Sequence, residues 1–166
     1  MAEAQRKTIL IVEDDAGVAL LEQRSLERAG YAVLAAATAD EALRHLQSQP
    51  VSLILLDYRL PGDLDGLAFY ERVKAAGHDL PVILVTGFGN EATVIQALRV
   101  GVRDFITKSV EYLDYLPVAV ERVLKQVETE HQLVESEARL ASIINSRPHD
   151  YFFVCVSGRV ARFPPA

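Results

Sequence analysis

Five short apolar runs, rich in aliphatic and β-branched residues, recur along the first two thirds of the chain. Each run ends abruptly at polar residues, glycine or proline, which is the pattern of strands buried on both faces of a sheet. The predicted strands cover residues 8–12, 31–36, 51–56, 81–85 and 102–107.

The segments between these runs have apolar residues at helical spacing. In residues 16–29 we assign Val18, Leu21 and Leu26 to the apolar face, with Asp15 as N-cap. Further helices are predicted after the capping box Thr38–Glu41, over 67–76, and from Asn90 to about Val100. Alternating strands and helices predict an α/β fold, a doubly wound five-stranded parallel sheet with helices on both faces.

A different pattern starts after Asp114. Apolar residues alternate at spacings of four and three, and Glu130 and Glu137 fill the two remaining positions; the apolar positions are 116, 120, 123, 127, 134, 141 and 144. This heptad seam predicts a long C-terminal helix that pairs with another helix, as in a homodimer. Because proline is tolerated only in the first helical turn, Pro117 places the helix start near Asp114.

Composition narrows the class of protein. The 166 residues are 50% apolar, with a single cysteine, and the net charge is −6. Acidic and basic residues balance from Val118 onward, so the negative charge lies in residues 1–117, and we expect no nucleic-acid partner. Without a signal-peptide pattern or an apolar stretch of membrane length, we expect a cytoplasmic protein that does not bind membranes.

The polar residues that follow the strands suggest a reaction. In a parallel sheet the carboxyl ends of the strands meet at one edge, and these ends carry Glu13, Asp14, Asp57, Thr86 and Lys108. Three carboxylates favour a hard divalent cation, of which Mg²⁺ is the expected one. A carboxylate can attack phosphorus to give an acyl phosphate, while a lysine neutralises the phosphoryl charge and a threonine hydroxyl donates to it.

Four motifs stand at these strand ends: Ile11–Asp15, Leu55–Gly62, Val85–Gly87 and Asp104–Lys108. With them, residues 7 to about 125 resemble a response-regulator receiver domain of flavodoxin-like fold. The resemblance implies a phosphoacceptor, metal ligands, a counter-charge and a coupled switch pair. The phosphoacceptor would be Asp57 and the counter-charge Lys108. The metal ligands would be Glu13, Asp14, Asp57 and the Arg59 carbonyl. The switch pair would be Thr86 with Phe105. The resemblance also implies a histidine kinase or phosphotransfer protein as phosphoryl donor.

Three features depart from the family pattern. The loop from Asp57 to Gly66 is one residue longer than the commonest form, and Glu13 stands where aspartate is commoner. Ser109 replaces the usual proline after Lys108, so we expect a trans bond between them, because a cis bond before a non-proline residue is costly.

A second resemblance covers residues 137–166, which look like the opening of a PAS sensor domain. We therefore expect a receiver domain over 7–125, a linker or coiled-coil helix over 126–147 and a partial PAS-like segment over 148–166. Such an order is typical of a larger PAS-containing, or hybrid, sensor kinase or regulator.

One alternative function uses the same nucleophile. A metal-dependent phosphohydrolase also places an aspartyl nucleophile after a strand, but usually has a second aspartate two residues later as acid and base. That position is Arg59, which argues against turnover. We expect no classical enzyme in this chain, only self-phosphorylation and autodephosphorylation.

Overall fold

The structure is a computed structural model that describes residues 6–62, 65–87, 91–145, 152–156 and 159–163. The chain forms two compact units, residues 1–127 and 128–166. The predicted helix cap Asn90, the loop residue Asp63 and the predicted turn at 157–158 lie outside the described residues.

The first unit is built on one parallel sheet, as the sequence predicts. Its strands are β1 (Thr8–Val12), β2 (Ala32–Ala36), β3 (Leu53–Asp57), β4 (Val82–Thr86) and β5 (Asp104–Thr107). Their order in the sheet is β2-β1-β3-β4-β5, and every neighbouring pair is parallel. The order reverses between β1 and β3, and in such sheets ligands bind beyond the carboxyl ends of the strands at that point.

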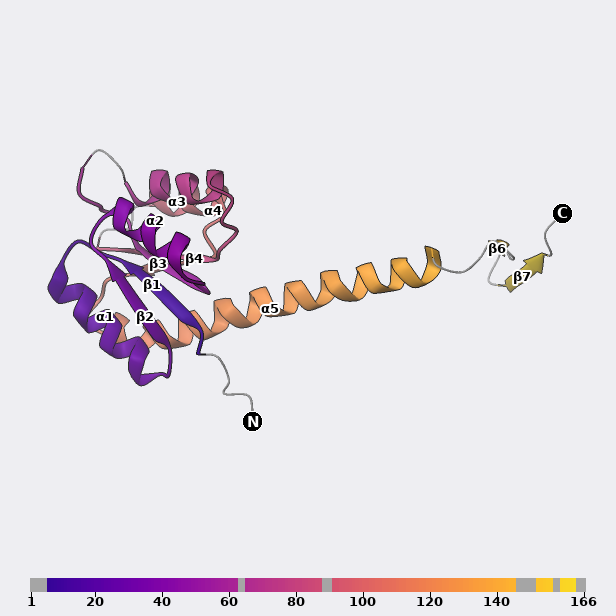
Figure 1. Ribbon diagram of the computed structural model, residues 1–166, viewed down its shortest axis with the longest axis horizontal. Helices are drawn as coiled ribbons and strands as arrows, with labels where there is room; N and C mark the ends of the chain where they lie inside the picture. The colour runs from indigo at the N-terminus through magenta and orange to yellow at the C-terminus, as the bar shows by residue number, and fades with distance from the viewer. Residues whose placement is uncertain (1–5, 63–64, 88–90, 146–151, 157–158, 164–166) are drawn as a thin grey trace. The chain divides into compact units, whose positions relative to one another are not determined.

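Helices cover both faces of this sheet (Figure 1). They are α1 (Ala16–Arg28), α2 (Ala39–Ser48), α3 (Gly66–Ala75), α4 (Glu91–Val100) and α5 (Tyr112–Asn145). Alternate strand residues point to opposite faces, so the sheet feeds two separate cores. One core packs against α2, α3 and α4, and the other against α1 and the first part of α5.

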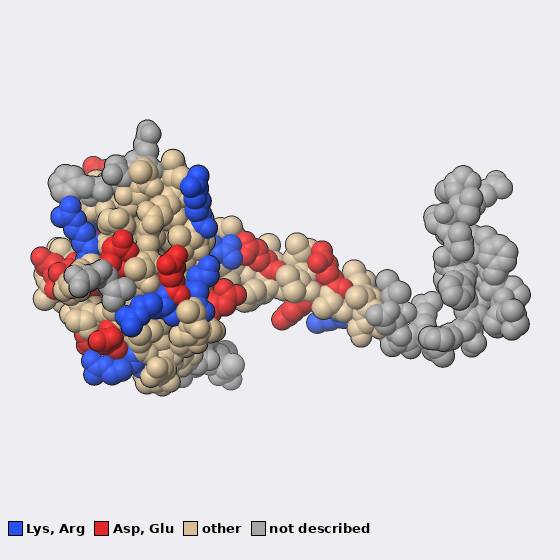
Figure 2. Space-filling view, turned by 90° about the horizontal axis from the view of Figure 1, so that it is seen from above, with Lys and Arg blue, Asp and Glu red and all other residues tan. Residues whose placement is uncertain are grey.

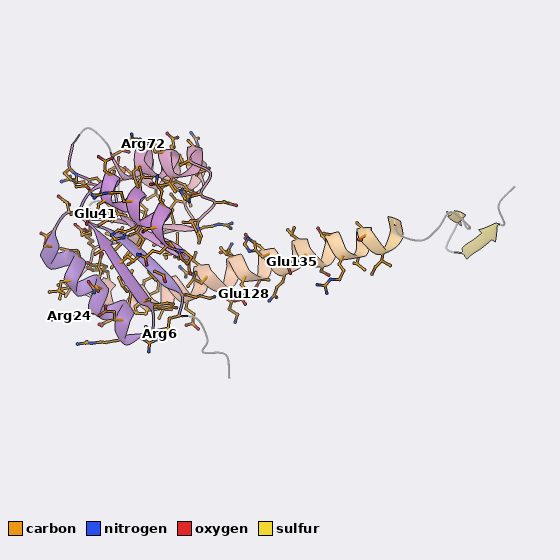
Figure 3. The ribbon with its side chains drawn as sticks, viewed as in Figure 1. Arg6, Arg24, Glu41, Arg72, Glu128 and Glu135 are labelled. Atoms are coloured by element: carbon orange, nitrogen blue, oxygen red, sulfur yellow. The ribbon has the colours of Figure 1, made fainter. Side chains whose placement is uncertain are left out.

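Side-chain caps fix where the helices begin. The Asp15 carboxylate accepts from the backbone N–H groups of Gly17 and Val18, which confirms its predicted role. Thr38 likewise caps α2, because its hydroxyl oxygen accepts from Glu41 N–H. The Glu41 side chain, on the first turn of that helix in Figure 3, accepts in turn from the backbone N–H of Ala37 in the preceding loop. Asp65, which the sequence suggests is a solvated loop residue, is instead the N-cap of α3, because its carboxylate accepts from Ala68 N–H.

The buried face of α1 differs from the predicted one. Leu21 is 50% exposed, whereas Glu22 is only 1% exposed, so a carboxyl occupies a position that helical periodicity assigns to an apolar residue. Leu26 is fully buried, as predicted. The α1 helix therefore presents a polar group to the sheet edge where the candidate chemistry lies.

The start of α5 also corrects the sequence analysis. The helix begins at Tyr112, not near Asp114, so Pro117 is its sixth residue and lies beyond the first turn. Proline has no N–H to donate to the carbonyl of Leu113, four residues before it. Here the Ser25 hydroxyl of α1 donates to that carbonyl at 2.6 Å, which satisfies the acceptor that proline leaves open.

The first part of the predicted heptad seam belongs to the core of the first unit. Leu116, Val120 and Val123 are at most 1% exposed and pack against the sheet with Leu26 of α1. These three residues are therefore unavailable for pairing with a second helix. At the later seam positions Val134 is 63% exposed and Ala141 is exposed, so pairing along this part of α5 stays a prediction.

The second unit contains that later part of α5 and a two-stranded antiparallel sheet. Its strands are β6 (Phe152–Val156) and β7 (Arg159–Phe163). Glu128 and Glu135 project from the helix in Figure 3. Among the residues that the structure describes, no helix has the length and apolar character that crossing a membrane requires.

Candidate functional site

The strand ends bring the predicted residues to one edge of the sheet. Asp57 and Thr86 are the last residues of β3 and β4, and Glu13 and Lys108 directly follow β1 and β5. The side chains of Ile9 and Ile11 pack toward α1 and α5, and the same alternation continues to Glu13. Strand geometry therefore explains why these residues from distant parts of the sequence converge.

Three carboxylates form an acidic cluster at this edge. One oxygen from each of Glu13, Asp14 and Asp57 lies within 4.8 Å of the others. Glu13 and Asp57 are 4% and 8% exposed, whereas Asp14 is exposed. Carboxylate oxygens at this spacing, with an opening to water on one side, suit a hard cation such as Mg²⁺, which retains several water ligands.

Lys108 supplies positive charge to the cluster. Its Nζ lies 2.5 Å from Glu13 Oε2 and 3.4 Å from Asp57 Oδ1. Burial works to lower the pKa of Lys108, but the hydrogen bond with Glu13 and the nearby carboxylates outweigh it, and the pKa is raised. The ammonium group is therefore held charged beside the candidate nucleophile.

Burial raises the pKa of both buried carboxyls of the cluster. For Asp57, burial outweighs the charge and hydrogen bond of Lys108 and the backbone hydrogen bond from Arg59. For Glu13, burial outweighs its hydrogen bond with Lys108 and the backbone N–H of Asp15. One lysine does not neutralise three carboxylates, so a divalent cation would relieve the remaining repulsion.

The loop after Asp57 is held close to the strand end. Gly66 N–H donates to the Tyr58 carbonyl at 2.8 Å, and an isolated antiparallel bridge joins Arg59 to Asp65. A Cβ at Gly66 would lie 2.5 Å from the Asp57 carbonyl oxygen, so only glycine fits there. The longer loop thus still closes on the backbone of Asp57, while the role of the Arg59 carbonyl as a metal ligand stays a prediction.

The predicted switch pair lies on the opposite face of the sheet. Leu84 pairs with Phe105 across β4 and β5, so Thr86, two residues after Leu84, projects from the same face as Phe105. Thr86 is 3% exposed, and Phe105 is partly buried against the α2, α3 and α4 core. Their movement on phosphorylation stays a prediction.

The bond between Lys108 and Ser109 is trans, as predicted, since no peptide bond between described residues is cis. Lys108 N–H donates to the Thr86 carbonyl at 2.8 Å, and Ser109 N–H donates to the Thr107 carbonyl. This backbone pairing aims Lys108 at the acidic cluster without the usual proline.

Two further residues near the cluster were missed by the sequence analysis. Glu22 of α1 is buried, and the Tyr112 hydroxyl of α5 donates to its Oε1 at 3.3 Å. Burial and the charge of Glu13 raise the pKa of Glu22 to about 7. A glutamate among charged helix residues usually lies on the surface, so nothing in the local pattern marks this one.

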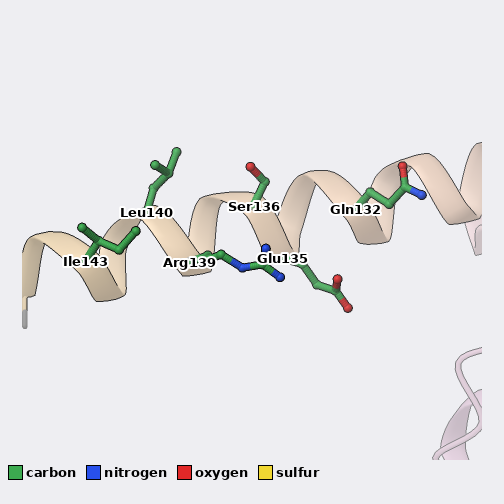
Figure 4. Close-up of a pocket in the computed structure, with 6 residues that line it drawn as sticks. All are labelled: Gln132, Glu135, Ser136, Arg139, Leu140 and Ile143. Carbon is green, nitrogen blue, oxygen red and sulfur yellow. The ribbon is translucent and has the colours of Figure 1, made fainter.

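A shallow groove occurs on the later part of α5, in the second unit, and contains none of the predicted site residues (Figure 4). Its lining residues are Gln132, Glu135, Ser136, Arg139, Leu140 and Ile143.

On the first unit, basic and acidic side chains are interspersed in the view of Figure 2. The candidate chemistry therefore rests on the acidic cluster.

The fold and this cluster define a class of protein. The family model for the response regulator receiver domain matches residues 9–121, from β1 into α5. The chain therefore belongs to the response regulator receiver domain family, and its five-stranded sheet is the receiver fold of that family.

Individual relatives agree with this assignment. The chain is similar to the C4-dicarboxylate transport transcriptional regulatory protein DctD of Rhizobium meliloti, with 39% identity over 61% of this chain and 22% of the relative. It is 32% identical to the acid tolerance regulatory protein ActR of Sinorhizobium medicae, over 74% of this chain and 62% of the relative.

Solved structures show the same fold. NtrX from Brucella abortus matches with a TM-score of 0.74 and 32% identity, over 80% of this chain and 30% of that structure. A CheY-like receiver domain protein from Methanospirillum hungatei matches with a TM-score of 0.65 and 31% identity, over 75% of this chain and 98% of that structure.

The chain spans 22% of the length of DctD and 62% of ActR. DctD is by name a transcriptional regulatory protein, so these relatives do not support the expectation that nucleic acid is excluded as a partner. We expected no nucleic-acid partner because of the charge distribution in this chain. That charge gives no information about the parts of the relatives that this chain does not match.

Proposed function

We propose that this chain is the phosphoacceptor of a two-component phosphorelay and that Asp57 takes the phosphoryl group from a histidine kinase or phosphotransfer protein. The observation that supports this most directly is the pairing of Asp57 with Lys108 inside a cluster of three carboxylates. The Asp57 carboxylate attacks phosphorus, the bond from phosphorus to the donor breaks, and the electron pair of that bond leaves with the donor.

Glu13, Asp14, Asp57 and the Arg59 carbonyl would hold Mg²⁺ in this proposal. A bound Mg²⁺ neutralises charge on the phosphoryl oxygens. Lys108 adds a second positive charge at Asp57. The partial burial of the site strengthens both interactions relative to bulk water.

In this proposal, phosphorylation of Asp57 changes the conformation of the switch pair, Thr86 and Phe105. The Thr86 hydroxyl donates to a phosphoryl oxygen, and Phe105 turns inward into the space that Thr86 leaves. The later part of α5 then relays the change by pairing with a second copy of the chain along the later seam positions, Val127, Val134, Ala141 and Ile144. Val134 is 63% exposed, and a helix with an apolar stripe can bury that stripe only against a partner.

The wider context that we propose is a cytoplasmic regulator or hybrid sensor kinase, in which the PAS-like segment 148–166 begins a further domain. Family membership favours the phosphoacceptor function over a phosphohydrolase, because receiver domains of response regulators are phosphorylated by histidine kinases. Arg59 in place of an aspartate two residues after Asp57 supports the same choice.

The test is phosphorylation of the full chain by a small phosphodonor, such as acetyl phosphate, with Mg²⁺. The product is followed by intact mass spectrometry, and we expect one added phosphoryl group per chain in the wild type. Asp57→Asn keeps the shape of the side chain and removes the nucleophile, so it should remain unlabelled while its circular dichroism spectrum is unchanged.

Asp40→Asn is the matched control, because Asp40 is an exposed carboxylate in the first turn of α2 that is not a member of the acidic cluster, and it should label as the wild type does. Normal labelling of Asp57→Asn would show that another residue is the acceptor. Release of many equivalents of phosphate from an unrelated phosphomonoester would favour the phosphohydrolase instead.

A further inference from the structure

A polar contact between α1 and α5 lies on the same side of the sheet as the acidic cluster. The Glu22 side chain is almost fully buried, and the Tyr112 hydroxyl donates to its Oε1 at 3.3 Å. That distance is long for an O–H···O hydrogen bond, but the low dielectric of a buried site makes the bond stronger than it would be in water. Removing the Tyr112 hydroxyl would leave the buried Glu22 carboxyl without this donor.

Tyr112 is tied closely to Lys108 along the chain. It is the first residue of α5, and only Ser109, Val110 and Glu111 separate it from Lys108. Tyr112 N–H also donates to the Ser109 carbonyl at 3.4 Å. A displacement of the first residue of α5 therefore passes directly to the backbone that carries Lys108.

Glu22 also contributes to the electrostatic field of the site. Its own pKa is shifted by burial and then by the charges of Glu13 and Lys108, and its charge contributes in turn to the raised pKa of Lys108. The side chain thus lies within electrostatic reach of the same lysine whose backbone Tyr112 restrains. The connection to Lys108 rests on geometry, namely the Glu22–Tyr112 contact and the short backbone segment from Tyr112 to Lys108.

We propose that Glu22 and Tyr112 are positioning residues for Lys108: the buried contact fixes the first turn of α5 on α1 and thereby holds the lysine over Asp57. This inference rests on the proposed phosphoacceptor function. It adds two residues to the set that controls the reaction, neither of which touches the reacting atoms. Glu22 and Tyr112 act only through the placement of Lys108.

Three variants test the pair. Tyr112→Phe removes the donor, and Glu22→Leu removes the acceptor and places an apolar side chain at the buried position. Glu22→Gln keeps an oxygen that accepts from Tyr112. Ser25→Ala is the matched control, because it breaks the neighbouring α1–α5 hydrogen bond, from Ser25 to the Leu113 carbonyl.

The first measurement is the maximal rate of labelling by acetyl phosphate at saturating Mg²⁺ and donor. We expect Tyr112→Phe and Glu22→Leu to lose about tenfold, within the range that a small misplacement of a reacting group costs. Glu22→Gln should stay within about twofold of the wild type. Wild-type rates in Tyr112→Phe and Glu22→Leu, or an equal loss in Ser25→Ala, would overturn the proposal.

The second measurement does not depend on phosphorylation. Competitive acetylation with mass spectrometry reports how reactive each lysine amine is, and Lys125, which is exposed, serves as internal reference. We expect Lys108 to become several times more reactive in Tyr112→Phe and Glu22→Leu, because it leaves the acidic cluster. In Glu22→Gln its reactivity should change much less, because only the small contribution of the Glu22 charge to the pKa of Lys108 is lost. Unchanged reactivity of Lys108 in all variants overturns the positioning role. If the wild type is not phosphorylated by acetyl phosphate although its Lys108 reacts slowly in the acetylation experiment, the phosphoacceptor function is contradicted instead.

Discussion

The buried carboxyl of Glu22 should make the stability of the receiver unit depend on pH. The pKa of Glu22 rises from its ordinary value of 4.5 to about 7 on folding, mainly through burial. The folded state therefore binds a proton more tightly than the unfolded state does. Below pH 4.5 Glu22 is neutral in the folded and the unfolded state and does not lower the free energy of unfolding. As the pH rises from 4.5 through 7, Glu22 ionises more readily in the unfolded state, and the free energy of unfolding falls.

The size of the effect follows from the shift. A change of about 2.5 pKa units at roughly 1.4 kcal/mol per unit gives a loss of about 3 kcal/mol by pH 8. Glu22→Gln has no such group to ionise, so at pH 8 it should be more stable than the wild type by an amount that approaches this figure. At pH 4.5 the two proteins should have nearly equal free energies of unfolding.

Urea denaturation followed by circular dichroism between pH 4.5 and 8 measures this difference. Glu13 and Asp57 also have raised pKa values, but they occur in both proteins, so only their coupling to the Glu22 charge remains in the comparison. Glu27→Gln, which changes an exposed carboxylate of the same helix, is the control and should follow the wild type. A Glu22→Gln protein that tracks the wild type at every pH would refute the assignment of a buried, ionising carboxyl.

Three other substitutions test the architecture. Gly66→Ala should destabilise the fold by about 1–3 kcal/mol in urea titration, because its Cβ would lie 2.5 Å from the Asp57 carbonyl oxygen; wild-type stability would contradict that close approach. Glu13→Gln should weaken Mg²⁺ binding at least tenfold in calorimetric titration, since it removes one carboxylate of the cluster, and equal affinity would exclude Glu13 as a ligand. Val120→Glu should unfold the receiver unit, whereas Val134→Glu should change its stability by less than about 0.5 kcal/mol, because these residues are 0% and 63% exposed.

Much of the fold follows from local patterns. The apolar runs that predict five strands are all strands in the structure, since a run buried on both faces has few other stable arrangements. The convergence of Asp57 and Lys108 follows as well, because parallel strands deliver their carboxyl ends to one edge.

The errors occur where tertiary contacts override a local rule. Pro117 was expected to mark the first turn of its helix, but Ser25 of α1 satisfies the carbonyl that proline leaves open, and the helix starts earlier. Periodicity assigned Leu21 to the core, yet Glu22 is buried instead because Tyr112 supplies it with a donor. Each partner lies far away in the sequence, so no local window contains the information.

The same heptad pattern had two physical sources. Leu116, Val120 and Val123 satisfy it because they pack on the sheet, and Val134 continues it on an exposed helix surface. Apolar spacing shows which residues share a helix face, but it does not show whether that face meets a sheet of the same chain or another helix. The receiver core and the proposed seam could therefore not be separated by sequence alone.

The contacts of α5 also bear on how the protein emerges from the ribosome. The sheet face that holds Ile9 and Ile11 stays uncovered on one side until the residues of α5 up to Leu124 have been made. Translation at about 5–20 residues per second separates Thr86 from Leu124 by roughly two to eight seconds. During that interval the nascent chain carries an almost complete sheet with one apolar face covered only by α1, and this is the period in which we expect it to need a chaperone.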